Sequence, residues 1–428
     1  MGSIALHNTR SLPSPQVPQA QARLLTIDVL RGFALFGILY SHMIFWYSGG
    51  PLPEKFYTAY MDIPSGIAVG LYVLFFNGKF FSLFSFLFGL SFYIQIKGLV
   101  AKHENAVMRF GWRLLILGLI GLIHHAVWRA DILSIYVPLG FMLLLARNLS
   151  NKAIAILGVV FILNIPTKVI EVFSIAFQGT IEFVPNTFVE DGKKYFIAMN
   201  QSSFIQVIIH NVYALKEKLY FQLSTGRLFI TFGFFLVGML AGRLRWFEDI
   251  ARQQSFFKKA WKRSWQCLAV VAVAGLVVAV SVTVLHIDAK NSSWIRWLSG
   301  LLADVFNASM TVFYIAGISL LMLKPNWNLR LSPLSHIGKM ALTSYLSQTL
   351  FGVFLFFHFG LGLFLETSPA LNIVLCCLIF YVQLLFCKIW LQHFHYGPVE
   401  WLWRSATYFK WQPLRKASCH KWQNPSEV

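Results

Sequence analysis

Three ionisable residues interrupt one apolar stretch near the start of the chain. In RLLTIDVLRGFALFGILYSHM, Asp28 and Arg31 come early and His42 comes near the end. A helix advances about 100° and about 1.5 Å per residue, so the three side chains share one stripe and His42 lies about 16 Å beyond Arg31. Charged groups in a membrane usually face the bundle interior or a watery cavity. We therefore expect Asp28 and Arg31 to form an ion pair and His42 to act as a general base.

A second group of candidate catalytic residues lies in GLIGLIHHAVWRADILSIY. His124 and His125 come near the end of one predicted helix, and Asp131 begins the next after a tight turn. A carboxylate that holds an imidazole in one tautomer supports general-base catalysis. We therefore expect His42, His124 and Asp131 to lie together on the outer side of a membrane as catalytic residues. His125 and His358 are predicted to lie on the same side.

Each of these residues also has a structural interpretation. Asp28 and Arg31 suit an ion pair at a membrane interface, from which a long arginine side chain reaches water. His42 suits a neutral, hydrogen-bonded packing residue. Asp131 suits the N-terminus of a helix, where a carboxylate accepts backbone N–H groups. Which interpretation holds depends on the helices that position these side chains.

The composition is that of a membrane protein with many spans. The chain has 428 residues, of which 57% are hydrophobic and only 12% are charged, whereas a soluble domain has about a quarter charged residues. The net charge is +19, but the basic residues lie between apolar runs, which indicates membrane topology and not nucleic-acid binding. The 5 cysteines have no zinc-like spacing, so we predict no metal site and no disulfide framework.

About ten apolar runs are long enough to cross a bilayer. Lysine and arginine are concentrated in alternate connections, which predicts an all-α bundle of about ten spans in the cell membrane, with both termini cytoplasmic. The second run contains Asn77 and Lys79, and we expect an interfacial piece there, followed by a span from near Phe80. The predicted spans are 27–47, 69–96, 111–128, 131–147, 153–171, 227–243, 265–286, 299–323, 341–364 and 370–394.

The chain is predicted to divide into two halves of five spans between two tails. The long outer connection carries QSSFIQVIIHNVYALKEKLYFQL, whose apolar spacing predicts an amphipathic helix on the membrane or over the bundle. No soluble domain and no pair of interrupted helices in matching halves is apparent. The predicted parts are a disordered tail at 1–22, a half with the long outer loop at 23–226, a second half at 227–410 and a basic tail at 411–428.

Six segments, spread over nearly the whole chain, carry a family resemblance. They are IDVLRGFALFGIL from Ile27, KFFSLFSFLFGLSF from Lys79, GLIHHAVWRADIL from Gly121, GKMALTSYLSQTL from Gly338, FGLGLF from Phe359 and GPVEWLWRSATY from Gly397. Through these segments the chain resembles the YeiB-like family of bacterial membrane proteins, whose C-terminal region is the domain of unknown function 418. The last segment is the most specific of the six.

The first helix is also similar to the opening of the membrane acyltransferases, namely the family 3 acyltransferases and the heparan glucosaminide acetyltransferases. Family 3 members carry Asp-x-x-Arg-Gly near the cytoplasmic end of this helix and a histidine about three turns later. Here those positions are Asp28, Arg31, Gly32 and His42. The resemblance implies an integral membrane enzyme that moves an acyl group, typically acetyl, from cytoplasmic acyl-CoA to a hydroxyl or amine at the outer side.

The resemblance also implies roles for individual residues. His42, or His124 oriented by Asp131, would remove a proton from the acceptor. The acceptor would be a glycan, a lipid headgroup or a small metabolite. Membrane lipid is an expected partner, and a homo-oligomer is left open. The residues expected to bind the phosphates of acyl-CoA and to stack on its adenine are Arg31, Lys339 and Arg404, with Trp401 or Trp403.

These inner-face residues have structural interpretations too. Lys339 and Arg404 also follow from the excess of positive charge on the cytoplasmic side of membrane proteins. Trp401 also suits an interface anchor. Glu400 could pair with Arg404 one helical turn on.

A transporter or permease-like carrier of a small solute is the main alternative function. About ten spans, a polar stripe and histidines at two depths would also suit a proton-coupled carrier. The absence of interrupted helices in matching halves counts against a carrier. A non-catalytic sensor or assembly partner is a third possibility. A carrier would move solute without consuming acyl-CoA, whereas a sensor would neither move solute nor consume acyl-CoA.

Overall fold

The computed structural model describes residues 19–50, 62–177, 188–289 and 292–416. Within these ranges the chain is helical, and its only β-type pairing is an isolated bridge between Phe394 and Arg415. The helices are α1 (Gln19–Ser41), η1 (His42–Trp46), α2 (Ile63–Leu71), η3 (Tyr72–Phe76), α3 (Phe80–Ala101), α4 (Ala106–Val127), α5 (Leu133–Ala146), α6 (Asn151–Ile162), α7 (Ile165–Ala176), α8 (Phe188–Asn200), α9 (Phe204–Tyr213), α10 (Leu215–Ser224), α11 (Arg227–Arg243), α12 (Gln254–Val284), α13 (Ser293–Leu321), α14 (Pro325–Leu331), α15 (Leu334–Lys339), α16 (Ala341–Phe356), α17 (Pro369–His393) and α18 (Pro398–Tyr408).

The helices form a bundle of membrane-spanning length. Among the described residues, 6 helices are long and apolar enough to cross a membrane, and up to 8 spans result if each bent helix pair is one span. The shorter apolar helices α5 and α16 occupy two further predicted spans. The all-α, multi-pass fold class is thereby confirmed. The count of ten spans and the orientation of the termini stay predictions.

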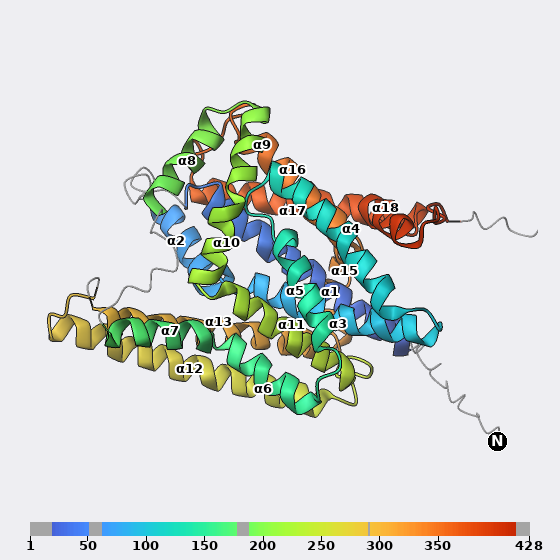
Figure 1. Ribbon diagram of the computed structural model, residues 1–428, viewed down its shortest axis with the longest axis horizontal. Helices are drawn as coiled ribbons and strands as arrows, with labels where there is room; N and C mark the ends of the chain where they lie inside the picture. The colour runs from blue at the N-terminus through green and yellow to red at the C-terminus, as the bar shows by residue number, and fades with distance from the viewer. Residues whose placement is uncertain (1–18, 51–61, 178–187, 290–291, 417–428) are drawn as a thin grey trace, which may run out of the picture.

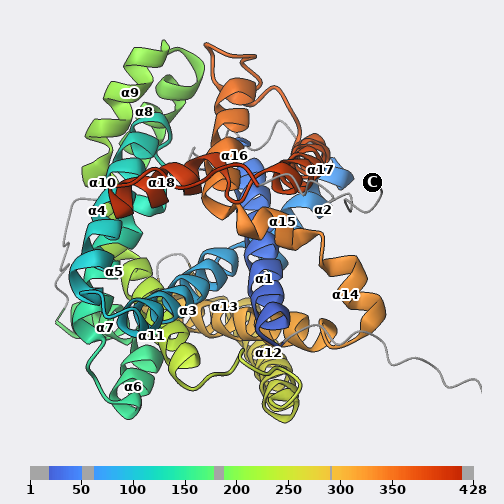
Figure 2. The same ribbon diagram turned by 90° about the vertical axis from the view of Figure 1, so that its right-hand side faces the viewer.

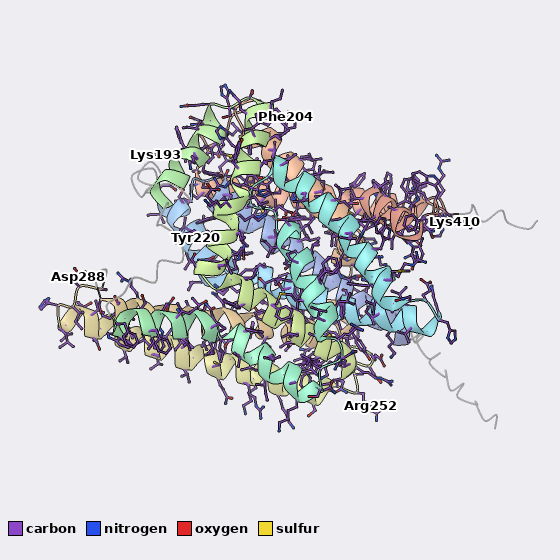
Figure 3. All side chains as sticks on the ribbon, in the orientation of Figure 1. Lys193, Phe204, Tyr220, Arg252, Asp288 and Lys410 are labelled. Atoms are coloured by element: carbon purple, nitrogen blue, oxygen red, sulfur yellow. The ribbon has the colours of Figure 1, made fainter. Side chains whose placement is uncertain are left out.

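The two ends of the bundle differ in their charged residues. Arg252 and Lys410 lie at one end and Asp288 lies at the other (Figure 3). The long helices α12 and α13 run side by side between these ends (Figure 1). We name the two ends of the bundle the basic end, marked by Arg252 and Lys410, and the neutral end, marked by Asp288. The basic end is the one predicted to face the cytoplasm.

Helix α1 lies at the centre of the bundle. It contacts α3, α15, α16 and α17, and it lies near the middle of the end-on view (Figure 2). Leu30 and Leu35 on this helix are 0% exposed. Two glycines let α15 approach it closely, because a Cβ on Gly32 would lie 2.1 Å from the Leu334 carbonyl oxygen and one on Gly338 would lie 1.8 Å from that of Asp28. The charged stripe of α1 is therefore held inside the fold.

Several of the spans are interrupted by residues with a left-handed backbone. Gly78 (φ 81) precedes α3, Asn164 (φ 55) separates α6 from α7, and Gly226 (φ 68) separates α10 from α11. The bend is 49° between α6 and α7 and 72° between α10 and α11. As expected from the sequence, a piece at 63–76 precedes the span that begins at Phe80.

The two bent pairs meet at Asn164. Its side-chain amide donates to the Thr225 carbonyl oxygen at 3.1 Å and to Asp304 Oδ2 of α13 at 3.3 Å. Hydropathy does not predict the break at Asn164, because a single left-handed residue within an apolar run leaves the hydropathy unchanged. This break falls within the fifth predicted span, and the break at Gly226 comes directly before the sixth, so the two are not counterparts in two halves.

Two local expectations differ in detail from the structure. The predicted amphipathic helix of the long connection is two helices, α9 and α10, separated at Ala214. Helix α1 begins at Gln19, so the last four residues of the predicted N-terminal tail are helical. The rest of that tail, and residues 417–428 of the C-terminal tail, lie outside the described residues.

Glu400 links the C-terminal helix α18 to the start of α16. Its carboxylate accepts the backbone N–H groups of Leu342 at 2.7 Å and Thr343 at 3.0 Å, and the Thr343 hydroxyl at 2.5 Å. The expected Glu400–Arg404 pair is absent from the ion pairs of the described residues. Arg404 lies instead over the rings of Tyr396 and Tyr408, because the exposed amides of α16 offer the carboxylate several donors at once.

We predict that Glu400→Ala lowers the free energy of unfolding by about 2 kcal/mol, because buried donors at the start of α16 lose their acceptor. The measurement is thermal melting of the protein purified in detergent, where the melting temperature should fall by several degrees. Glu366 is an exposed carboxylate in the α16–α17 connection, so Glu366→Ala is the matched control and should leave melting unchanged. Equal melting temperatures for the two variants would contradict this prediction.

Candidate functional site

At the basic end of α1, Asp28 and Arg31 form the predicted ion pair. Arg31 Nη1 lies 2.7 Å from Asp28 Oδ1, and Arg31 Nη2 donates to Ser91 Oγ of α3 at 2.5 Å. Asp28 is 7% exposed, whereas 25% of the Arg31 side chain is exposed. Lys339, an exposed residue at the end of α15, is close enough for its charge to act on Asp28. The structure thus brings Arg31 and Lys339 to the same end of α1.

At the other end of α1, His42 begins a short π-helical turn. Such turns occur frequently at functional sites. The half-buried imidazole makes an edge contact with Trp128, with ring centroids 5.7 Å apart. No hydrogen bond joins this imidazole to any described residue. His42 lies within electrostatic range of His124, Asp131 and Arg227, so the predicted proximity of His42, His124 and Asp131 is present.

His124 is the centre of a buried chain of hydrogen bonds. Its Nδ1 lies 2.6 Å from Asp131 Oδ1, and its Nε2 lies 2.8 Å from Thr349 Oγ1 of α16. The three residues are 6%, 2% and 1% exposed, in the order His124, Asp131, Thr349. A carboxylate on Nδ1 favours the tautomer with the proton there, which leaves Nε2 to accept the threonine hydroxyl. This is the arrangement of a hydroxyl, a base and an orienting acid.

Asp131 has two tasks at once. It accepts the backbone N–H groups of Leu133 at 3.0 Å and Ser134 at 2.8 Å, at the start of α5. Lys218 Nζ lies 3.5 Å from its Oδ2. Burial alone would raise the pKa of Asp131, but the hydrogen bond to His124 and the charge of Lys218 outweigh burial and lower it. Asp131 is therefore ionised at neutral pH, and the structural and functional interpretations hold together.

The other two histidines of the neutral end have different surroundings. His125 Nδ1 lies 3.2 Å from Lys218 Nζ, which also donates to Ser134 Oγ at 2.7 Å. His125 is thus part of the shell around Asp131. His358 is exposed, and its backbone N–H donates to the Met199 carbonyl. No hydrogen bond or ring contact of the described residues joins His358 to the His124 chain, and its place on the outer side stays a prediction.

Two residues of this site were missed in the sequence. Thr349 belongs to a run of polar residues in α16 whose contacts come from other helices. Lys218 lies in the connection between predicted spans, where a lysine would ordinarily face water. No local pattern distinguishes either residue, because each meets its partner through a contact across a large sequence separation: 225 residues for Thr349 and His124, and 93 for Lys218 and His125.

The predicted binding residues of α18 make contacts of their own. Trp401 stacks on Trp411, with ring centroids 5.1 Å apart, and donates from Nε1 to the Gln412 carbonyl oxygen at 2.7 Å. Trp403 lies under the guanidinium of Arg113 at 3.8 Å. Nε of Arg113 and Nε of Arg404 are buried without a hydrogen-bond partner. No hydrogen bond, ion pair or ring contact joins Trp401 or Arg404 to Arg31 or Lys339 in the described part of the chain.

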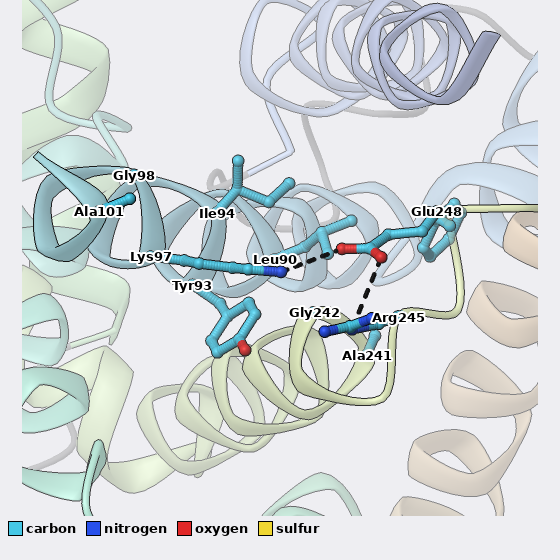
Figure 4. Close-up of a pocket in the computed structure, with 11 residues that line it drawn as sticks. Leu90, Tyr93, Ile94, Lys97, Gly98, Ala101, Ala241, Gly242, Arg245 and Glu248 are labelled. Carbon is cyan, nitrogen blue, oxygen red and sulfur yellow. Dashed lines mark hydrogen bonds and ion pairs between the residues drawn. The ribbon is translucent and has the colours of Figure 1, made fainter. Parts of the chain in front are cut away.

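A pocket of about 290 Å³ opens at the basic end between α3 and α11 (Figure 4). Three charged residues of its lining form ion pairs, with Glu248 Oε1 lying 3.4 Å from Lys97 Nζ and Glu248 Oε2 lying 3.6 Å from Arg245 Nε. The walls are otherwise largely apolar, with Leu90 and Tyr93 on α3. None of the predicted site residues lines this pocket, so it is separate from the His124 chain.

Comparison with known proteins finds uncharacterised bacterial relatives of the chain. Residues 241–410 match the family described as "Protein of unknown function (DUF418)". The chain is 30% identical to "Uncharacterized protein YxaH" of Bacillus subtilis over 95% of this chain and 99% of the relative. It is 25% identical to "Uncharacterized 39.9 kDa protein in amylase 3'region" of Bacillus acidopullulyticus, over 92% of this chain and 96% of that protein.

A shorter match of higher identity is to "Uncharacterized protein YeiB" of Escherichia coli, which is 45% identical over 71 residues, 17% of this chain and 18% of YeiB. No solved structure matches the chain significantly. The match to YxaH over almost the whole of both chains, together with the matched C-terminal region and the apolar helices, decides the family. The chain belongs to the DUF418, or YeiB-like, family of multi-pass membrane proteins.

Proposed function

We propose that this protein is a cell-membrane acyltransferase that moves an acyl group from cytoplasmic acyl-CoA to a hydroxyl or amine at the outer side. The observation that carries the proposal is the buried Asp131–His124–Thr349 chain, which lies beside His42. A base whose one nitrogen is held by a carboxylate and whose other nitrogen accepts a hydroxyl is the arrangement used to activate oxygen nucleophiles.

The chemistry follows from the proton positions. When an acceptor hydroxyl takes the place of Thr349 at His124 Nε2, that nitrogen removes its proton while the acceptor oxygen attacks the thioester carbonyl. The new C–O bond forms, the C–S bond breaks, and the proton passes from His124 to the departing thiolate of CoA. Asp131 stabilises the imidazolium that exists between these steps. Amine acceptors react in the same way with a C–N bond.

The acyl-CoA donor would bind at the basic end of α1. Arg31 and Lys339 supply positive charge for the phosphates of acyl-CoA. The thioester must then reach from there toward His42, about 16 Å along the same helix. Since α1 and the π-helical turn η1 form one continuous helical segment that carries both groups, the backbone fixes the distance between the phosphate site and the base. This proposal assigns acyl-CoA as the co-substrate.

A carrier is the second candidate function, and the bent helices favour it. Interrupted spans that meet inside a bundle are typical of solute and ion sites in transporters. Here Asn164 at one break contacts both Thr225 at the other break and Asp304 of α13. The two functions differ in a simple respect, because a carrier needs two compartments and an enzyme turns over in detergent.

We predict that purified protein in detergent releases CoA from radiolabelled acetyl-CoA when acceptors are present, and that His124→Asn and Asp131→Asn each lower kcat about 10²- to 10⁴-fold. Asp131→Asn keeps the size of its side chain but loses the charge that orients His124, and His124→Asn loses the base. His358→Ala, at an exposed histidine of the same end, is the control and should retain wild-type turnover. Wild-type protein without turnover on any acyl-CoA, combined with solute uptake into vesicles, would replace the enzyme by the carrier.

We further predict that Arg31→Ala weakens binding of acetyl-CoA about tenfold or more, since a hydrogen bond to a charged group contributes about 1.5–3 kcal/mol. Equilibrium binding of labelled acetyl-CoA measures this, with melting temperature recorded in parallel. Arg245, whose side chain is 65% exposed, is the basic-end control, and Arg245→Ala should bind normally. A lower melting temperature with unchanged affinity would make the Asp28–Arg31 pair purely structural.

A further inference from the structure

Arg227 is a guanidinium inside the bundle that has no polar partner among the described residues. It is the first residue of α11 and is partly buried, directly after the break at Gly226. Its Cζ lies 4.0 Å from the centroid of the Phe81 ring. Its side chain forms no hydrogen bond and no ion pair with the described residues. This arrangement is unusual within a membrane-spanning segment, where charged side chains are nearly always paired.

The arginine at the other end of the same helix shows the contrast. Arg243 donates to the Leu149 carbonyl oxygen at 2.7 Å, to Asn151 Oδ1 at 3.2 Å and to the Arg147 carbonyl oxygen. That side chain has an evident structural task, namely to join α11 to the α5–α6 connection. Arg227 has no comparable task, although an arginine cannot lose its proton to escape the cost of burial.

The geometry leaves the donors of Arg227 open. The Phe81 ring covers one face of the guanidinium and stabilises its charge. The five N–H groups point outward in the guanidinium plane, where the ring cannot accept them. The two tyrosine hydroxyls within electrostatic range of Arg227 form their hydrogen bonds with other residues, Tyr136 with Ser85 at 2.7 Å and Tyr72 with Asn77 at 3.3 Å. A planar set of free N–H donors matches the paired oxygens of a carboxylate or phosphate.

The charge balance of this region points the same way. Tyr72, Tyr136, His42 and Lys218 lie within electrostatic range of Arg227. None of them is an anion at neutral pH. Lys218 is already paired with Asp131. The positive charge of Arg227 therefore remains uncompensated.

We propose that Arg227 binds an oxyanion, the carboxylate or phosphate of an acidic acceptor. His42 is in range of both Arg227 and the His124–Asp131 pair. An anion on Arg227 would thus place the rest of the acceptor beside the bases. The identification of the anion with the acceptor rests on the proposed acyl transfer, whereas the anion site itself does not. The anion comes either from a lipid headgroup or from a soluble compound, and the experiment has an arm for each.

The test is thermal melting of the purified full-length protein in a neutral detergent at constant ionic strength. The arms are chloride alone, sodium phosphate, sodium acetate, and micelles containing phosphatidylglycerol, with phosphatidylcholine as the reference lipid. At least one anion should raise the melting temperature of the wild type by several degrees, and the shift should grow with concentration as ligand linkage requires. A response only to phosphatidylglycerol identifies a lipid source, and a response to phosphate or acetate a soluble one.

Two variants make the outcome decisive. Arg227→Gln should abolish the anion-dependent shift and, without added anion, should melt at or above the wild-type temperature, because it removes an unpaired charge and no hydrogen bond. Arg243→Gln, on the same helix, should melt lower in every arm and keep the shift. The proposal is overturned if no anion stabilises the wild type, or if Arg227→Gln lowers melting in chloride as Arg243→Gln does.

The same samples separate this inference from the proposed function. An Arg227-dependent shift without turnover of any acyl-CoA would keep the anion site and remove the acyltransferase. Turnover that depends on His124 but is unchanged in Arg227→Gln, together with no anion-dependent shift, would remove the anion site and keep the enzyme.

Discussion

The packing of helices at the neutral end depends on the compensation of one buried charge, the carboxylate of Asp131. A buried carboxylate is tolerable only when hydrogen bonds and a cation compensate for lost hydration. Here His124 of α4, the first amides of α5 and Lys218 of α10 supply that compensation. Because His124 also reaches Thr349 of α16, one charge joins four helices. Removal of that charge would leave Lys218 unpaired and His124 without an orienting partner.

Helix α1 connects this arrangement to the basic end. Near Asp28 the backbones of α1 and α15 pack closely, because Gly32 and Gly338 have no Cβ that would separate them. The π-helical turn at the other end of α1 carries His42 toward Trp128. Most of the helix is buried against neighbouring helices, so it cannot tilt without disturbing them. The separation between the ion pair and the imidazole is therefore a property of the fold, as a reaction between two membrane faces would require.

Much of this could be predicted from residues close together in the chain. The hydropathy predicts a multi-pass α-helical protein, and the spacing of Asp28 and Arg31 predicts their ion pair, since both depend only on helical periodicity. His124 and Asp131 are also near in sequence, so their contact follows from a tight turn. By contrast, the expected Glu400–Arg404 pair is absent from the ion pairs of the described residues. The Glu400 carboxylate instead accepts backbone N–H groups 58 and 57 residues away in the chain.

The sequence by itself thus determined the helical class, the central charged stripe and one half of the candidate site. The tertiary structure alone decided that Thr349 completes the hydrogen-bonded chain, that Lys218 neutralises Asp131, and that Arg227 has no polar partner in the described part of the chain. It also decided where the spans break, at Asn164 and Gly226. The physical reason is that periodicity is a property of the local backbone. Compensation of a buried charge depends on which distant helix packs against it, and many sequences with the same hydropathy would pack differently.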